Sequence, residues 1–551
     1  MSHFFITTAI DYTNAAPHIG HAYEKVLADV LARYHRLKGD EVFFLTGVDQ
    51  HGQKVQQSAE KQGIAPQEFV DGITAKFRAL WEKLDVRYDG WSATTDERHK
   101  DCVRKILTRL NDEGQIYKAK REGYYSVRQE QFLTDKERGE NGEFGAEWGE
   151  VVFIEEENYY FRLAEHKQWL LDLIDRRADF ITPEFRRGEL RNAVEKLTGD
   201  LCISRPKSRL SWGIEFPFDP EFVTYVWFDA LVNYISFSDY DPLVQTLDSQ
   251  SSTFRTRWPA LHVIGKDIMI PAHGIYWPIM LKALGFTADE IPPLLVHGFW
   301  NMSGAKISKS LGNVVDPDAL ADKYGAEALR YYLMSDIATG KDADFSEERL
   351  VQRYNSDLAN SLGNLLNRTL SMAQKYQGGK LVKVLHPSEP EWSLLIALTS
   401  YKEAFSGLVL APDITSMPLD SDPSSDEPKS TTYVKTDAYK VNDALSAAVG
   451  AATACNQFID SKKPWALAKA VDDADQKARL DAVLYHLAES LRIIAILISP
   501  VLPKAAAGIF AQLNWDKPFR LEDAQWGGLP DGHVLGAPTP LFPRIEAAPP
   551  A

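Results

Sequence analysis

Two short segments of this chain, 288 residues apart (306 − 18), carry side chains suited to holding a triphosphate. His18 and His21 flank Gly20 just before a helical pattern. Lys306 and Lys309 lie on a segment rich in Gly and Ser. A helix N-terminus with imidazole donors favours phosphate, and paired ammonium groups can offset charge that develops as pyrophosphate leaves. Taken singly, the histidines could be a helix cap and the lysines a solvated loop, but in combination they indicate phosphate chemistry.

The two segments, residues 17–21 and 306–310, resemble the HIGH and KMSKS motifs of class I aminoacyl-tRNA synthetases in residue type and in order. The resemblance implies that the two histidines and the two lysines are catalytic. It also implies that ATP, accompanied by Mg²⁺, is bound by His18, Gly20, His21, Lys306, Ser308 and Lys309.

Further segments are similar to the bacterial-type methionyl-tRNA synthetases along nearly the whole chain. They are residues 9–14, 46–52, 225–230, 264–268 and 277–278. The resemblance implies that L-methionine and ATP give methionyl-adenylate. The methionyl group would then pass to the 3′ end of tRNA(Met), including the initiator tRNA.

The same resemblance assigns a set of residues to methionine. A carboxylate, Asp49, would hold the amino group, and aromatic side chains suit the soft thioether. His273 would lie near the sulfur, and Arg205 near the methionine carboxylate as a further catalytic residue beside Asp49. From composition alone, the aromatic members would be ordinary core residues. The methionine-binding set is Ala9, Ile10, Tyr12, Asp49, Trp227, Ala230, Tyr234, Ile268 and His273.

Three residues in the C-terminal half match the anticodon-reading positions of the family. Asn364 and Arg368 lie one helical turn apart and can read base edges, and Trp465 can stack on an unpaired base. Without the resemblance, an ordinary solvated helix face would be the better interpretation.

The local patterns predict the elements that position these residues. A strand over residues 3–9, a helix over 21–37 and a strand over 41–45 form a βαβ unit. Such a unit predicts an α/β fold with a Rossmann-like, doubly wound parallel sheet, whose functional residues gather at the carboxyl ends of the strands. Further strands are expected at 225–228, 262–264 and 294–296.

The chain divides into five expected regions. Residues 1–117 and 206–300 are the two halves of the catalytic domain. Residues 118–205 are a connective insertion with antiparallel strands at 124–127 and 150–154 and a helix over 166–177. Residues 301–345 carry the lysine motif and a stem-contact region. Residues 346–551 are a helical anticodon-binding bundle, interrupted by an expected mobile loop at 413–437.

The composition restricts the cellular compartment and the kinds of ligand and partner that we expect. Only three cysteines occur, Cys102, Cys202 and Cys455, which is typical of a reducing compartment, and we expect a cytoplasmic location. Because Cys202 is the only cysteine within 118–205, no zinc knuckle built from cysteine pairs is expected there. A net charge of −16 argues against strong non-specific binding of nucleic acid. No apolar run is long enough for a membrane span, and without an appended dimer-forming barrel we expect a monomer.

Other functions stay open at this stage. A leucine, isoleucine or valine enzyme needs a larger editing insertion, and a cysteine enzyme would use zinc. A non-catalytic tRNA-binding relative would not need His18, His21, Lys306 and Lys309. A small nucleotidyltransferase would lack the long helical C-terminal half.

Overall fold

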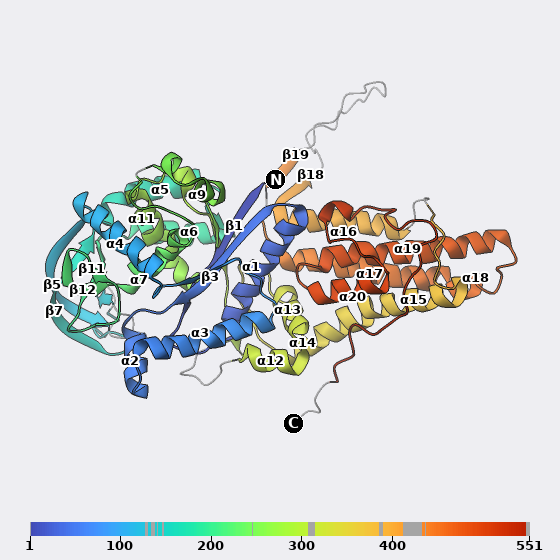
Figure 1. The fold of residues 1–551 in the computed structure, drawn as a ribbon, viewed down its shortest axis with the longest axis horizontal. Coiled ribbons are helices and arrows are strands. Elements are labelled where there is room, and N and C mark those ends of the chain that lie inside the picture. Colours follow the sequence, from blue (N-terminus) through green and yellow to red (C-terminus); the bar gives the residue numbers. More distant parts are fainter. Residues whose placement is uncertain are drawn as a thin grey trace, which may run out of the picture.

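The computed structural model describes residues 2–126, 131–133, 138–139, 141–145, 148–244, 246–302, 304–306, 315–384, 389–411, 432–435 and 437–546. Figure 1 shows an elongated molecule with most of its strands in the N-terminal half and a bundle of long helices in its C-terminal half. Among the described residues, no helix is both long and apolar enough to cross a membrane.

A seven-stranded sheet forms the centre of the N-terminal half, and its strands pair parallel throughout. The strand order is β2-β3-β1-β13-β14-β8, with β4 beside β3. The chain starts in the middle of the sheet and winds outward on both sides of β1, which confirms the predicted doubly wound fold. The strands are β1 (His3–Thr8), β2 (Asp11–Tyr12), β3 (Glu41–Asp49), β4 (Gly90–Ala93), β8 (Ile181–Thr182), β13 (Leu261–Gly265) and β14 (Leu294–His297).

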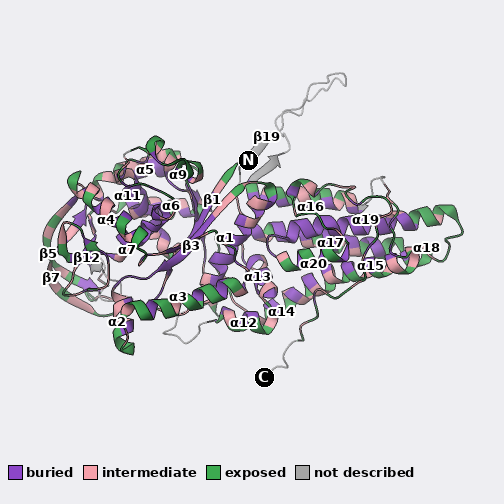
Figure 2. Ribbon diagram, in the orientation of Figure 1, coloured by how far each residue is buried: buried purple, intermediate pink, exposed green. Residues whose placement is uncertain are grey.

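Helix α1 (Ile19–Lys38) connects β1 to β3 and lies between the sheet and the C-terminal elements (Figure 1). It begins after His18 and ends at Gly39, whose φ of 96° is the left-handed conformation that favours glycine. Most of α1 is buried, including its charged residues Glu24, Lys25 and Asp29 (Figure 2). Asp29 pairs with the fully buried Arg330, which also donates to the carbonyl of Val501 (2.8 Å). The helix that carries the two motif histidines is therefore fixed to both halves of the molecule.

Helices pack around the central sheet and the segments that join its strands (Figure 1). They are α2 (Gln53–Gln62), α3 (Pro66–Lys83), α4 (Glu97–Asp112), α8 (Asn233–Ser236), α9 (Ser252–Arg257), α10 (Lys266–Ile268), η5 (Met269–Tyr276) and α11 (Trp277–Ala283).

The expected insertion contains an antiparallel sheet in which β5 (Ile116–Ser126) pairs with β7 (Val151–Phe161). The predicted strands and the predicted helix, α5 (Lys167–Arg176), are confirmed. Strand β8 also falls within 118–205, yet it pairs with β14 and belongs to the central sheet. Other elements within 118–205 are β6 (Gln131–Leu133), α6 (Phe185–Glu195) and β9 (Leu201–Cys202), and β10 (Ser204–Pro206) crosses its end. Strand β10 pairs with β12 (Asp219–Thr224), which also pairs with β11 (Glu215–Phe216), both beyond residue 205.

The prediction of a strand at 225–228 is wrong. Strand β12 ends at Thr224, and Val226–Leu231 form helix α7. Val226, Trp227 and Phe228 favour strands by propensity, but such preferences yield to tertiary contacts. In the helical conformation Asp229 contacts two buried histidines, His51 and His99, which a local propensity does not take into account. The strands predicted at 262–264 and 294–296 are confirmed as β13 and β14.

The C-terminal half is a helical bundle, as predicted. Its core includes the leucine stripe Leu358, Leu362, Leu365, Leu366 and Leu370, all buried. Its elements and the helices leading to them are α12 (Pro317–Tyr324), α13 (Ala326–Ser335), α14 (Glu347–Arg353), η8 (Tyr354–Gly363), α15 (Asn364–Gln377), α16 (Glu389–Ser406), α17 (Val441–Lys462), α18 (Pro464–Leu467), α19 (Ala474–Ile498) and α20 (Pro503–Gln512).

The segment expected to be a mobile loop, 413–437, is partly a strand. Thr432–Lys435 form β19, which pairs antiparallel with β18 (Leu408–Ala411). Residues 412–431 and 436 lie outside the described part of the chain. After α20 the chain crosses the bundle as an extended strap, held where Gly528 donates its backbone N–H to the buried carboxylate of Glu489 (2.7 Å).

Candidate active site

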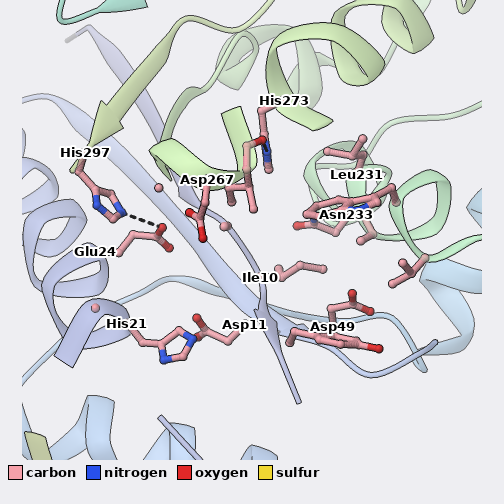
Figure 3. Close-up of a pocket in the computed structure, with 18 of the residues that line it drawn as sticks. Ile10, Asp11, His21, Glu24, Asp49, Leu231, Asn233, Asp267, His273 and His297 are labelled. Carbon is pink, nitrogen blue, oxygen red and sulfur yellow. Dashed lines mark hydrogen bonds and ion pairs between the residues drawn. The ribbon is translucent and has the colours of Figure 1, made fainter. Parts of the chain in front are cut away.

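A cavity of about 470 Å³ lies at the carboxyl ends of the central strands. This is the place where doubly wound sheets bind ligands. Figure 3 shows His21, Glu24 and His297 toward one end of it, and Asp49, Leu231 and Asn233 toward the other. Of the residues predicted from the sequence, the lining includes Ala9, Ile10, Tyr12, His18, Gly20, His21, Asp49, Trp227, Ala230, Tyr234, Ile268 and His273.

One end of the cavity is aromatic and uncharged. His273 faces the carbonyl of Ile268 through Nδ1 (3.0 Å) and the hydroxyl of Tyr234 through Nε2 (2.7 Å). Because a carbonyl can only accept, Nδ1 carries the proton and Nε2 accepts from the tyrosine. Burial lowers the pKa of His273 to about 4, so the ring is neutral near pH 7. Together with the ring of Trp227, 6.4 Å from that of His273, this end suits an apolar, polarisable side chain.

Asp49 supplies a carboxylate next to this aromatic end. It is the last residue of β3, and its backbone carbonyl accepts from Thr13 N (2.9 Å). Its side-chain Oδ1 accepts from the backbone N–H of His51 (3.3 Å) and from the Thr94 hydroxyl (3.4 Å). The carboxylate is therefore held in place by the strand end and remains beside the cavity, where it can bind a cationic amino group.

A buried histidine–aspartate–histidine triad lies behind this wall. Asp229 of α7 contacts His51 Nδ1 (2.6 Å) with one oxygen and His99 Nε2 (2.7 Å) with the other. Burial opposes ionisation of Asp229, but the two histidines outweigh it and lower its pKa to about 2. Because Trp227 and Ala230 lie on the same short helix, the triad fixes this cavity wall to the end of β3.

The other end of the cavity begins at the first motif. His18 Nδ1 accepts from Gly20 N, and His21 Nδ1 accepts from His18 N, both at 3.1 Å. This reciprocal pair caps α1 much as a Ser–Glu capping box does. A Cβ on residue 20 would lie 3.0 Å from the His18 ring, so a larger residue there would crowd that ring and displace it from its capping position. A helix N-terminus of this kind favours an anionic phosphate group.

Charged residues of α1 complete the wall near the first motif. Lys25 is fully buried and donates to Asp11 (2.8 Å) and Glu24 (2.9 Å). Glu24 also contacts His297 Nε2 (3.1 Å; Figure 3). Burial raises the pKa of Asp11 to about 7, although Lys25 opposes this shift. The other carboxylate on this wall is that of Asp267.

Several of these lining residues were not predicted from the sequence: Asp11, Glu24, Lys54, Asn233, Asp267 and His297. Three of the six could have been found from the strand-end rule. Asp11 follows the end of β1 by three residues, Asp267 follows β13 by two residues, and His297 ends β14. Glu24 and Lys54 give no such signal, because acidic and basic residues on helices usually face solvent.

Arg205 does not line the cavity. Its guanidinium lies 4.4 Å from the ring centroid of Tyr225, which does, and donates to the Ser204 carbonyl (2.7 Å). In the second motif, the described chain ends at β16 (Ala305–Lys306), which pairs with β15 (Trp300–Met302) beside the cavity residue Trp300. The predicted residues Ser308 and Lys309 lie outside the described residues.

The three predicted anticodon residues are exposed or half-buried on the bundle. Asn364 donates to Asn456 (3.3 Å), and Arg368 pairs with Asp460 (2.6 Å), so both contact α17. Trp465 is 42% exposed on α18, at the end of the bundle away from the central sheet (Figure 1). These roles stay predictions.

In the part of the chain that the structure describes, no group of three or more His, Cys, Asp or Glu side chains could hold a metal ion. The thiols of Cys102 and Cys455 are buried and that of Cys202 is half-buried, and all three are free. The absence of a structural zinc stays a prediction.

Comparison with known proteins identifies the family. Residues 4–370 match the family model described as "tRNA synthetases class I (M)", and residues 429–549 match the "anticodon binding domain of methionyl tRNA ligase". The methionine–tRNA ligase of Lactococcus lactis is 39% identical over 98% of this chain and 78% of its own length. That of Thermosynechococcus vestitus is 38% identical over 98% of both chains.

Solved structures agree with this assignment. The Mycobacterium tuberculosis methionyl-tRNA synthetase in complex with methionyl-adenylate matches with a TM-score of 0.85 and 35% identity, covering 99% of this chain and 100% of that one. Its ligand-free form matches with a TM-score of 0.78 and 33% identity, over 100% and 99% of the two chains. The chain therefore belongs to the methionyl-tRNA synthetase family.

Proposed function

We propose that this protein is a methionine–tRNA ligase that forms methionyl-adenylate in the cavity described above. One observation supports this most strongly. All nine residues assigned to methionine, drawn from segments between Ala9 and His273, line one cavity that continues to the His18–His21 cap. Relatives across the full chain carry the same function in their names.

In the first step, a carboxylate oxygen of methionine attacks the α-phosphorus of ATP. The bond from that phosphorus to the bridging oxygen breaks, and pyrophosphate leaves with its Mg²⁺. Asp49 would hold the methionine ammonium, while Trp227, Tyr234 and neutral His273 would surround the thioether. His18 and His21 would hold the phosphates, and Lys306 and Lys309 would offset charge that grows in the transition state.

In the second step, a hydroxyl of the 3′-terminal ribose of the tRNA attacks the carbonyl carbon of the adenylate. AMP leaves as the hydroxyl gives up its proton. We propose that Asn364, Arg368 and Trp465 select tRNA(Met), the initiator included, by reading and stacking on its anticodon. A cytoplasmic monomer without structural zinc is part of the same proposal.

Pyrophosphate exchange, measured with each amino acid in turn, tests the proposal. It predicts ATP–pyrophosphate exchange that depends on methionine and is strongest with it. Exchange strongest with leucine or cysteine would point to another class I synthetase. No exchange with any amino acid would favour a tRNA-binding relative without catalytic activity.

A further inference from the structure

The charge of the cavity lining is unbalanced. Four of the described lining residues have carboxylates, namely Asp11, Glu24, Asp49 and Asp267. Among the same described residues, Lys54 is the only lysine or arginine. The two substrates nevertheless bring a carboxylate and a triphosphate into contact, so the anionic groups of the complex need a cation between them.

The buried lysine of α1 does not meet this need. Lys25 donates to Asp11, Glu24 and the carbonyl of Ala9, so its three donors are used within the wall. Lys54 differs, because no carboxylate of the described residues pairs with its ammonium group. It is half-buried, lines the cavity and is the second residue of α2.

The turn before α2 separates Lys54 from Asp49 by only a few residues. Asp49 ends β3, and Gly52 turns the chain with a φ of 105°, a conformation that favours glycine. A Cβ on Gly52 would lie 2.7 Å from the Tyr12 hydroxyl, so Tyr12 packs directly against this turn. Asp49, Tyr12 and Lys54 therefore lie around one turn and all line the cavity.

We propose that the Lys54 ammonium binds the α-carboxylate of methionine while Asp49 binds its α-amino group. The two groups of a zwitterion are attached to one carbon, so opposite charges on either side of Gly52 are placed to hold both. The cation would also reduce repulsion between that carboxylate and the α-phosphate as they meet. This inference rests on the proposed function.

The proposal moves to Lys54 the role that the sequence resemblance gave to Arg205. The Arg205 guanidinium lies over the rings of Tyr225 (4.4 Å) and Tyr125 (5.7 Å), behind the cavity wall. Lys54 reaches the cavity itself.

The test compares a ligand that has the carboxylate with one that lacks it. Lys54→Met keeps the length of the side chain and removes its charge. We expect the KM for methionine in pyrophosphate exchange to rise roughly tenfold, with the KM for ATP within about twofold of wild type. Binding of methioninol, which has an alcohol in place of the carboxylate, should be unchanged. Lys54→Arg should restore most of the affinity for methionine.

Lys61→Met is the matched control, because Lys61 is exposed on the same helix and lies outside the cavity lining. Lys61→Met should leave the KM for methionine, the KM for ATP and the affinity for methioninol unchanged. Equal losses for methionine and methioninol would show that Lys54 only supports the local structure. A rise in the KM for ATP alone would assign it to the phosphates, and no change at all would also overturn the proposal. Wild-type exchange that fails with methionine would instead contradict the proposed function.

Discussion

The cavity and the proposed anticodon face of this synthetase, which carries Asn364, Arg368 and Trp465, are built in opposite ways. Around the cavity, Asp229 is fully buried between two histidines, and His273 is held by hydrogen bonds at both ring nitrogens. On the bundle, Trp465 is 42% exposed and Arg368 pairs with Asp460, whose side chain is 65% exposed. A small ligand needs a wall fixed before it arrives, whereas unpaired bases can be met by side chains that adjust.

The cavity and the bundle face should differ most in how much stability each loses when one of its carboxylates is removed. Asp229→Ala leaves two buried histidines without their partner and should lower the free energy of unfolding by about 3–5 kcal/mol. Asp460→Ala breaks a surface ion pair and should change it by less than about 1 kcal/mol. Urea unfolding of both variants and of the wild type measures these changes in the free energy of unfolding. Similar values would show that the two regions are equally fixed.

The pH dependence of stability should report His273. Its folded pKa of about 4 lies below the ordinary value of 6.5, so the unfolded chain binds more protons between these pH values. The contribution of His273 to the free energy of unfolding is therefore at its full value above about pH 6.5. It falls by about 3 kcal/mol as the pH drops through 4. His273→Gln should lose less stability than wild type between pH 7 and 4. Parallel curves for the two proteins would contradict the burial of a neutral ring.

Asp49→Asn should separate the two sites by function. The variant keeps the shape of the side chain but loses the charge that we propose binds the methionine ammonium. We expect kcat/KM for methionine in pyrophosphate exchange to fall roughly 100-fold, which is about 2.7 kcal/mol. Affinity for tRNA should not change. If tRNA binding weakened in parallel, the two regions would not be independent.

Trp465→Ala should give the reverse result with a smaller effect. Loss of one stacked base costs about 1–3 kcal/mol, so kcat/KM for tRNA should fall between roughly fivefold and 150-fold. Methionine-dependent exchange should be unaffected. Trp392→Ala is the matched control, because Trp392 is also exposed, at 59%, on α16. Equal losses of kcat/KM for tRNA in both variants would contradict an anticodon role for Trp465.

Much of the fold could be predicted because hydrophobic periodicity and strand ends are local signals. The βαβ unit, the parallel sheet and the leucine stripe of the bundle follow from such patterns. Helix α7 could not be predicted this way, because Val226, Trp227 and Phe228 favour strands and the contacts that Asp229 makes join residues far apart in the sequence. Strand β8 has two residues and gives no periodic signal.

In the candidate site, too, some features could be predicted from the sequence and others depend on contacts between distant segments. The nine residues that the family motifs assign to methionine line one cavity, and their roles there stay predictions. Glu24 and Lys25 could not be predicted, since a helix usually turns its charges to solvent and α1 is buried on nearly every side. The position of Arg205 behind Tyr225 depends on how β10 packs, which no motif encodes.

A crystal structure with a non-hydrolysable methionyl-adenylate analogue would test most directly whether this cavity binds methionyl-adenylate with its side chain at the aromatic end. We expect the thioether to lie among Trp227, Tyr234 and His273, the ammonium on Asp49, and the adenosine beside Gly20. A methionine side chain outside this aromatic end, or an analogue bound elsewhere on the protein, would contradict this expectation.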